Sequence, residues 1–292
     1  MKNPILISMI LIFTACSADE VLFDLQGHRG ARGLLPENTV PGFLKAVELG
    51  VNTIELDLVV TQDREILVSH EPWFNHQVST HPDGRPVTEE EQLDLNIFKM
   101  NLEEVQRYDV GSRGNELFPN QEPLQVAKPA LRDAIEAIEK YVEEMQLPAV
   151  RYNIEIKSQP EWYDVMVPQP AEFARILYNE LQALDITGRV NIQSFDPATL
   201  VEFRNLAPDI PQALLVGNDD SMEENLERLG YIPEIYSPHF RLVTPELMDQ
   251  ARENEMLVIP WTVNTVAEMQ ALLDLGVDGI ITDYPDSAAV LR

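Results

Sequence analysis

Apolar and amphipathic segments alternate along most of this chain. Apolar runs that predict strands occur at 21–26, 51–60, 150–156, 190–193, 212–216, 235–237, 257–261 and 279–282. Amphipathic stretches that predict helices follow them, at 39–49, 129–146, 170–184, 197–205, 222–229, 244–254, 265–275 and 285–291. Eight strands that alternate with helices predict an α/β fold, a (β/α)8 TIM barrel. A doubly wound open sheet has the same alternation, but polar motifs recur at strand ends from the first strand to the last, which favours the barrel.

The second predicted strand is followed by an unusually long polar stretch. A short apolar segment at 66–69 leads into residues 70–125, which include the turn signal Pro82-Asp83-Gly84. This stretch is too long for a simple loop in a compact domain, so it predicts a small insertion with short elements of its own. His76 and His81 are predicted to lie on its surface. No repeat or linker interrupts the pattern, and one barrel domain is expected over 21–292, with the insertion at about 70–125.

The charge balance narrows the classes of partner. The 292 residues include 49 acidic and 21 basic side chains, a formal net charge of −28. Nonspecific nucleic-acid binding needs basic patches, so no nucleic-acid partner is expected. The acidic surface would also repel anionic substrates, so any anion site must be locally positive. Nothing in the composition indicates an oligomeric state.

The first residues predict export. Lys2 precedes a short apolar run at 4–15, which is too short to span a bilayer but suits the core of a signal peptide. Cys16, the single cysteine of the chain, directly follows this run, and its position resembles a bacterial lipoprotein processing site. We expect residues 1–15 to be a signal peptide and Cys16 to be lipidated. The protein would then be an exported lipoprotein of the bacterial cell envelope, periplasmic or on the surface, and would contact the membrane only through its lipid anchor. The alternatives are an ordinary signal peptide cut nearby, or an uncleaved start.

Paired acidic residues on two predicted strands are the first sign of chemistry. Glu55 and Asp57 lie two apart and share one face, and Glu155 and Lys157 repeat the arrangement. In a barrel these faces converge at the carboxyl end of the strands, where three carboxylates would repel one another without a cation. Three carboxylates together with Arg29 and Lys157 give the site a formal charge of −1. A divalent ion would change this charge to +1, which would attract a phosphodiester with its single negative charge. Oxygen ligands favour Ca²⁺ or Mg²⁺. The alternative is a solvated edge of a sheet.

Two histidines follow predicted strands directly. His28 comes after the first strand and lies beside Arg29, and His70 comes after the apolar segment at 66–69. Imidazole exchanges protons near neutral pH, so a pair can serve the attacking group and the leaving group separately. We therefore expect both to act in catalysis.

Together these motifs resemble the glycerophosphodiester phosphodiesterase family. The resemblance rests on Gln26-Gly27-His28-Arg29-Gly30-Ala31, Pro36-Glu37-Asn38-Thr39, Ile54-Glu55-Leu56-Asp57, Ser69-His70-Glu71-Pro72, Glu155-Ile156-Lys157, Gln193-Ser194-Phe195, Trp261-Thr262-Val263-Asn264 and Gly279-Ile280-Ile281-Thr282-Asp283-Tyr284-Pro285. It implies a (β/α)8 barrel with an insertion after His70 and hydrolysis of glycerophosphodiesters to glycerol 3-phosphate and an alcohol. The glycerol hydroxyl would attack the phosphorus, and water would then open a cyclic phosphate.

The resemblance also implies roles for individual residues. One metal ion would be held by Glu55, Asp57 and Glu155, with His28 and His70 as the acid–base pair. Arg29 and Lys157 would contact the phosphate. Glu37 is expected at the substrate site through Arg29 or the metal surroundings, or else simply at the start of the first helix. As aromatic residues near the site, Phe195 and Trp261 are expected to wall the pocket, or else to belong to the core.

Two other functions fit parts of the pattern. A lysophospholipase-D-like activity on single-chain lipids would need a wide apolar approach to the site. A surface lipoprotein that binds phosphodiesters without turnover would not need two histidines suited to proton transfer, so the enzyme is favoured.

Overall fold

The computed structural model describes residues 23–288. Its parallel strands are β1 (Asp24–Gly27), β2 (Thr53–Val60), β4 (Arg151–Ile156), β5 (Val190–Ser194), β6 (Gln212–Val216), β7 (Ile235–Pro238), β8 (Leu257–Val258) and β9 (Gly279–Thr282). The helices between them are α1 (Val40–Glu48), α3 (Leu131–Glu144), α4 (Pro170–Ala183), α5 (Pro197–Leu206), α6 (Met222–Leu229), α7 (Pro245–Glu253) and α8 (Val266–Leu275). Short 3-10 turns are η3 (Pro160–Trp162), η4 (Thr187–Arg189) and η5 (Phe240–Leu242).

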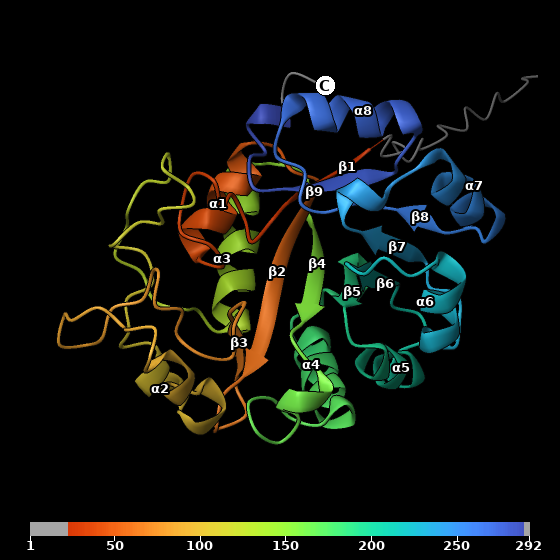
Figure 1. The fold of residues 1–292 in the computed structure, drawn as a ribbon. Helices are drawn as coiled ribbons and strands as arrows, with labels where there is room; N and C mark the ends of the chain where they lie inside the picture. The colour runs from red at the N-terminus through yellow and green to blue at the C-terminus, as the bar shows by residue number, and fades with distance from the viewer. Residues whose placement is uncertain (1–22, 289–292) are drawn as a thin grey trace, which may run out of the picture.

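The strands form a nearly closed barrel surrounded by the helices (Figure 1). Their order is β8-β7-β6-β5-β4-β2-β1-β9, and each neighbouring pair on this path is parallel. Backbone hydrogen bonds from Asp278 N to Val258 O (3.0 Å) and from Ile281 N to Pro260 O (2.9 Å) join the last two strands. The predicted (β/α)8 barrel is therefore confirmed, and the open-sheet alternative is not what this chain adopts.

Local sequence explains where the helices begin and end. Thr39 caps α1 by accepting a hydrogen bond from Gly42 N, and a proline occupies the first turn of that helix. Ser221 and Glu224 form a capping box at the start of α6, and Gly230 ends the helix in the left-handed conformation at φ 83°.

The sequence also predicted a helix at 285–291. The described part of that range, 285–288, contains no α-helix, and 289–291 lie outside the described residues.

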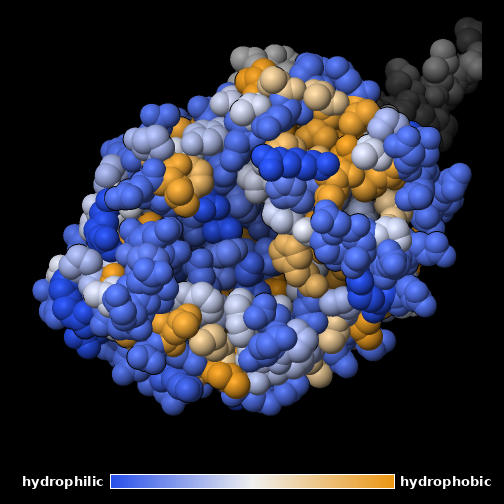
Figure 2. Space-filling model, viewed as in Figure 1, coloured by the Kyte–Doolittle hydropathy of each residue, from blue (hydrophilic) through white to orange (hydrophobic). Residues whose placement is uncertain are grey.

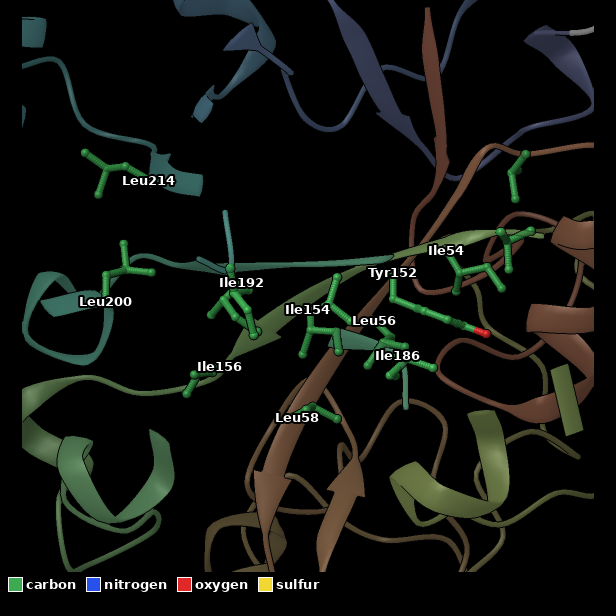
Figure 3. Packing of buried hydrophobic residues seen from close by; sticks show 14 of the residues in the cluster. Ile54, Leu56, Leu58, Tyr152, Ile154, Ile156, Ile186, Ile192, Leu200 and Leu214 are labelled. Atoms are coloured by element: carbon green, nitrogen blue, oxygen red, sulfur yellow. The ribbon is translucent and has the colours of Figure 1, made fainter. Parts of the chain in front are cut away.

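The main core lies between the barrel and its helices. All eight residues of β2 are buried, which is typical of parallel strands covered on both sides. Ile54, Leu56 and Leu58 of β2 pack in one cluster with Tyr152, Ile154 and Ile156 of β4 (Figure 3). Each such side chain contributes about 1.5–3 kcal/mol on burial. This outward apolar face fixes the register and leaves the inward face for polar residues.

The segment after β2 forms the predicted insertion. β3 (Ile66–Val68) pairs antiparallel with β2, and η1 (Gln92–Asp94), η2 (Ile97–Lys99) and α2 (Leu102–Val105) follow it at one side of the barrel (Figure 1). A separate apolar cluster holds this region together and includes Leu67, Phe74, Ile97 and Val105. His81 is buried there, with Nε2 3.0 Å from Glu91 Oε1, so the prediction that it lies on the surface is wrong.

The exterior of the molecule is largely hydrophilic in the view of Figure 2. None of the helices within residues 23–288 has the length and apolar character needed to cross a bilayer.

Candidate active site

Three buried carboxylates from two neighbouring strands meet at one point. The register of β2 with β4 pairs Asp57 with Glu155, and Glu55 lies two residues before Asp57 on the same face. One carboxylate oxygen from each residue lies within 4.8 Å of the others. Strand pairing thus creates a cluster of three oxygen donors from residues about a hundred positions apart.

The state of these carboxylates fits a divalent cation. Asp57 Oδ1 is buried and has no hydrogen-bond partner. Burial, together with repulsion from Asp57 and Glu155, raises the pKa of Glu55 well above its usual range, and burial likewise raises the pKa of Glu155. Burial alone would also raise the pKa of Asp57, but nearby Arg29 reverses this and lowers it. A hard cation such as Ca²⁺ or Mg²⁺ would occupy the free oxygen and offset the repulsion.

A network of buried amides orients Glu55 from below. Gln193 Nε2 donates to Glu55 Oε1 at 2.8 Å, and Asn153 Nδ2 donates to Gln193 Oε1 at 3.0 Å and to Gln26 Oε1 at 2.7 Å. Asn38 holds Asp57 similarly, donating from Nδ2 to Oδ2 at 2.7 Å. Such outer partners fix the direction of metal ligands and are costly to remove.

Arg29 connects the metal cluster to the turn after β1. Its backbone N–H donates to Glu55 Oε2 at 2.8 Å, and its guanidinium lies 3.2 Å from Asp57 Oδ2. The residue adopts the left-handed conformation at φ 50°. The following Gly30 has φ 87°, and a Cβ there would lie 2.7 Å from the backbone of Gly42. Only glycine therefore allows the turn to pack this closely against α1, which sets the position of Arg29.

Glu37 lies behind the arginines. It accepts from Arg29 Nη1 at 2.8 Å and lies 2.7 Å from Arg32 Nε. Burial would raise the pKa of Glu37, but these two cations outweigh it and lower that pKa. Glu37 does not line the catalytic cavity, and the cap of α1 is Thr39. Of the alternatives predicted for Glu37 from the sequence, the structure contains the hydrogen bond with Arg29.

Lys157 supplies a second cation from the end of β4. Its Nζ donates to Glu155 Oε1 at 2.7 Å and lies 3.9 Å from Asp57 Oδ1. Burial disfavours the charge, but Glu155 and Asp57 outweigh burial and raise the pKa of Lys157. Arg29 and Lys157 therefore stay positive on two sides of the carboxylate cluster.

Each predicted catalytic histidine is paired with a carboxylate. His28 Nδ1 lies 2.7 Å from Asp283 Oδ1, and His70 Nδ1 lies 2.9 Å from Glu71 Oε1. An ionised carboxylate can only accept, so Nδ1 carries the proton and Nε2 is left for a substrate. Burial lowers the pKa of His28, and nearby Arg29 adds to this effect, while Asp283 opposes it.

These groups surround one cavity of about 230 Å³ at the carboxyl end of the strands. Of the predicted residues, the cavity is lined by His28, Arg29, Glu55, His70, Glu155, Lys157, Phe195 and Trp261. Asp57 does not line the cavity and is fully buried. Phe195 and Trp261 meet edge to face at 5.3 Å between ring centroids. The structure thus gathers the predicted acid–base, cationic and acidic residues at one place.

Comparison with known proteins supports this picture. The model of the glycerophosphoryl diester phosphodiesterase family matches residues 28–287. The chain belongs to this family. It is therefore a phosphodiesterase, which confirms the resemblance read from its motifs. The family is metal-dependent, and the buried acidic cluster provides a place where a metal ion can bind.

Individual relatives cover nearly the whole phosphodiesterase. A glycerophosphodiester phosphodiesterase of Bacillus subtilis is 29% identical over 89% of this chain and 83% of its own length. A lysophospholipase D, GDPD1 of Homo sapiens, is 23% identical over 88% and 82%. A crystal structure from Silicibacter pomeroyi, described as a candidate glycerophosphoryl diester phosphodiesterase, aligns with TM-score 0.82 and 29% identity over 92% and 93%. An Oleispira antarctica phosphodiesterase in complex with sn-glycerol-3-phosphate shares the fold, with TM-score 0.71 and 22% identity over 93% and 98%.

Several site residues of the phosphodiesterase had not been assigned from its sequence. Asp283 and Glu71 both belong to the motifs quoted above. Asp283 directly follows a strand and Glu71 directly follows His70, and these positions could have marked both residues as partners of the histidines. Lys128 had none: its Nζ donates to Ser69 Oγ at 2.7 Å because a bridge between Leu67 and Ala130 returns the chain to β3. Burial lowers the pKa of Lys128, although nearby Glu71 opposes this.

These additions change the charge of the site. The described residues at the site include six carboxylates (Glu37, Glu55, Asp57, Glu71, Glu155 and Asp283) and four cations (Arg29, Arg32, Lys128 and Lys157). Their formal sum is −2 instead of the −1 expected from the sequence. One divalent ion would therefore neutralise the site, not make it positive. Attraction of a phosphodiester would then depend on the directed contacts of Arg29 and Lys157 rather than on net charge.

Proposed function

We propose that this phosphodiesterase uses one divalent ion, Ca²⁺ or Mg²⁺, to hydrolyse glycerophosphodiesters to glycerol 3-phosphate and an alcohol. The observation that carries the proposal is the meeting of three kinds of group on one cavity. These are a three-carboxylate cluster with a free oxygen, two cations beside it, and two histidine–carboxylate pairs. Each step of phosphodiester cleavage requires one of these groups.

Glu55, Asp57 and Glu155 would hold the ion. When bound, it would polarise a phosphate oxygen and stabilise charge in the transition state. Arg29 and Lys157 would bind the remaining phosphate oxygens, with the planar guanidinium suited to two of them. Both cations are buried against carboxylates, so they are held in place before the substrate arrives.

His28 and His70 would move the protons. One ring Nε2 takes the proton of the attacking glycerol hydroxyl as its oxygen bonds to phosphorus. The other donates a proton to the alcohol oxygen as its bond to phosphorus breaks. Water then opens the resulting cyclic phosphate to glycerol 3-phosphate by the reverse transfers. Asp283 and Glu71 hold the rings in the tautomer that leaves Nε2 free.

The proposal includes export and a lipid anchor at Cys16, which lies outside the described residues. Phe23 directly precedes β1 and lies at the end of the barrel opposite the catalytic cavity. Six residues separate Cys16 from Phe23, and the chain between the two reaches at most about 25 Å. An anchor at Cys16 would therefore direct the catalytic cavity away from the membrane. That orientation favours dissolved glycerophosphodiesters over lysophospholipids in a bilayer.

A product-release assay tests this function. The protein lacking residues 1–15 is dialysed against chelator and given several glycerophosphodiesters and a lysophospholipid, with and without added Ca²⁺ or Mg²⁺. We expect glycerol 3-phosphate only when a metal is supplied. Full activity in excess chelator would rule out the metal, and turnover of the lysophospholipid alone would assign the chain to lysophospholipase D activity instead.

A further inference from the structure

A second cavity lies beside the catalytic one at the same end of the barrel. Its volume is about 440 Å³, and its lining includes residues of the connections from β5 to α5 and from β6 to α6. Phe195 and Leu215 line both cavities. The catalytic cavity, at about 230 Å³, is smaller than the roughly 300–1,000 Å³ of typical small-molecule sites. The neighbouring cavity offers additional space for the alcohol part of a glycerophosphodiester.

Phe195 forms the boundary between the two cavities. Phe195 directly follows β5 and is 45% exposed. Gly217, at the end of β6, faces this boundary: a Cβ at that position would lie 3.6 Å from the rings of both Phe195 and Trp261. The absence of a side chain at Gly217 keeps the space beside Phe195 open.

The polar groups of the second cavity come from the β6–α6 connection and α6. The amides of Asn218 and Asn225 pair with each other at 3.0 and 3.2 Å. Arg228 donates to Asn225 Oδ1 at 2.5 Å and pairs with Asp220 at 2.8 Å at the half-exposed rim. Arg228 is the charged residue among those that line this cavity. The site therefore offers hydrogen-bonding groups against an apolar wall, and the charge of Arg228 is balanced by Asp220.

We propose that this second cavity binds the alcohol part of the diester and selects a neutral polyol, such as glycerol, over a quaternary ammonium alcohol. The inference rests on the proposed function. Amide and guanidinium groups can hydrogen-bond to the hydroxyls of a polyol, whereas the trimethylammonium group of choline has no hydrogen-bonding atoms. Phe195 would pack against the carbon chain.

A third cavity, of about 330 Å³, offers the competing location on the other side of Phe195. Its lining includes Glu155, Lys157, Gln159, Trp162 and Asp196. Lys157 pairs with Glu155 at 2.7 Å, which leaves Asp196 and the ring of Trp162 as the groups that suit a cationic alcohol. Placement of the alcohol in this third cavity would predict a preference for choline, which is the opposite of our proposal.

The test compares kcat/KM for three substrates: glycerophosphoglycerol, glycerophosphocholine and the methyl ester of glycerol 3-phosphate, whose methyl group is too short to reach either side cavity. We expect the wild type to prefer glycerophosphoglycerol over glycerophosphocholine by about tenfold. Arg228→Gln should reduce that preference about tenfold, the usual size of one lost hydrogen bond to a charged group. Gly217→Leu should lower kcat/KM for glycerophosphoglycerol at least tenfold more than for the methyl ester, and Gly217→Ala much less.

Matched controls are Arg132→Gln, an exposed ion-pair partner of Glu180, and Gly188→Leu, at an open position away from the site. Neither should change the substrate ratios. A wild-type preference for glycerophosphocholine, or an unchanged ratio in Arg228→Gln, would overturn the inference. Loss of the ratio in Gln159→Leu but not in Gly217→Leu would place the alcohol in the third cavity. If Gly217→Leu fails to fold, as its melting curve would show, Arg228→Gln decides. Failure of the wild type on all three substrates would instead overturn the proposed function.

Discussion

His28 and Asp283 are 255 positions apart, yet His28 Nδ1 lies 2.7 Å from Asp283 Oδ1. His28 follows the first strand of the barrel and Asp283 the last, and these strands are neighbours in the sheet. Asn264 Nδ2 donates to the other oxygen of Asp283 at 2.7 Å, which leaves the carboxylate little freedom. The contact that orients His28 therefore also links the first strand of the barrel, β1, to the last, β9.

The first prediction concerns the pH profile of Asp283→Asn. Burial and nearby Arg29 hold the pKa of His28 below its usual 6.5, while Asp283 raises it. Loss of the carboxylate should lower the pKa of His28 further, so the limb of kcat/KM against pH that reports His28 should move to lower pH, whether it acts as acid or base. Turnover should fall about 100-fold, the scale of a lost general acid or base. Asp286→Asn, an exposed neighbour, is the control. An unmoved limb would show that Asp283 does not act through His28.

The second prediction concerns the stability of the same variant. Burial would raise the pKa of Asp283, but His28 and Arg32 lower it to about 2, against an ordinary value of 3.8. A carboxyl group whose pKa is lower in the folded state stabilises the fold at every pH above its pKa in the unfolded chain. This contribution is lost as the pH falls through the folded-state pKa of about 2. Asp283→Asn should therefore be less stable by about 2 kcal/mol at pH 7, with the difference vanishing near pH 2. Urea unfolding across this range measures it, and a constant difference would contradict the electrostatic explanation.

The third prediction concerns proton transfer. His28→Ala and His70→Ala should each lower turnover by about 100-fold or more, because each removes a group that moves a proton. Metal content should stay near normal, since neither ring belongs to the carboxylate cluster. His76→Ala, in the insertion, is the control. A variant that keeps most of its turnover would mean that its histidine serves the structure alone.

The fourth prediction concerns Arg29. Arg29→Lys keeps the charge but loses the planar fork, which bridges Glu37, the metal cluster and two phosphate oxygens in the proposed complex. We expect kcat/KM to fall at least tenfold. Arg132→Lys, on the outer surface, should behave like the wild type. Equal kinetics for Arg29→Lys would show that only positive charge matters here.

The fifth prediction concerns location. In the bacterial cell, Cys16→Ser should release the protein into the soluble fraction or block its processing, because stable anchoring needs more than one acyl chain at that residue. Fractionation and intact-mass measurement check this. An unmodified cysteine, or a mature start beyond residue 16, would leave an ordinary secreted enzyme.

Much of the fold and the candidate site was open to prediction because the signals are local. The alternation of Ile54, Leu56 and Leu58 with Glu55 and Asp57 assigns one face to the core and one to chemistry, whatever lies next to the strand. The weakest prediction was the closing helix at 285–291, where no local pattern is strong. His81 was misplaced because its burial depends on a small core formed by the insertion as a whole.

By itself, the sequence determined the order of strands and helices, the polar faces and the family, since periodicity, caps and motifs are properties of neighbouring residues. The tertiary structure alone decided which polar groups meet. The register of β2 with β4 sets Asp57 beside Glu155, barrel closure brings Asp283 to His28, and the return of the insertion buries Lys128 against Ser69. It also decided the cavities on either side of Phe195. Such pairings depend on how apolar faces pack over long separations, and no local pattern encodes those distances.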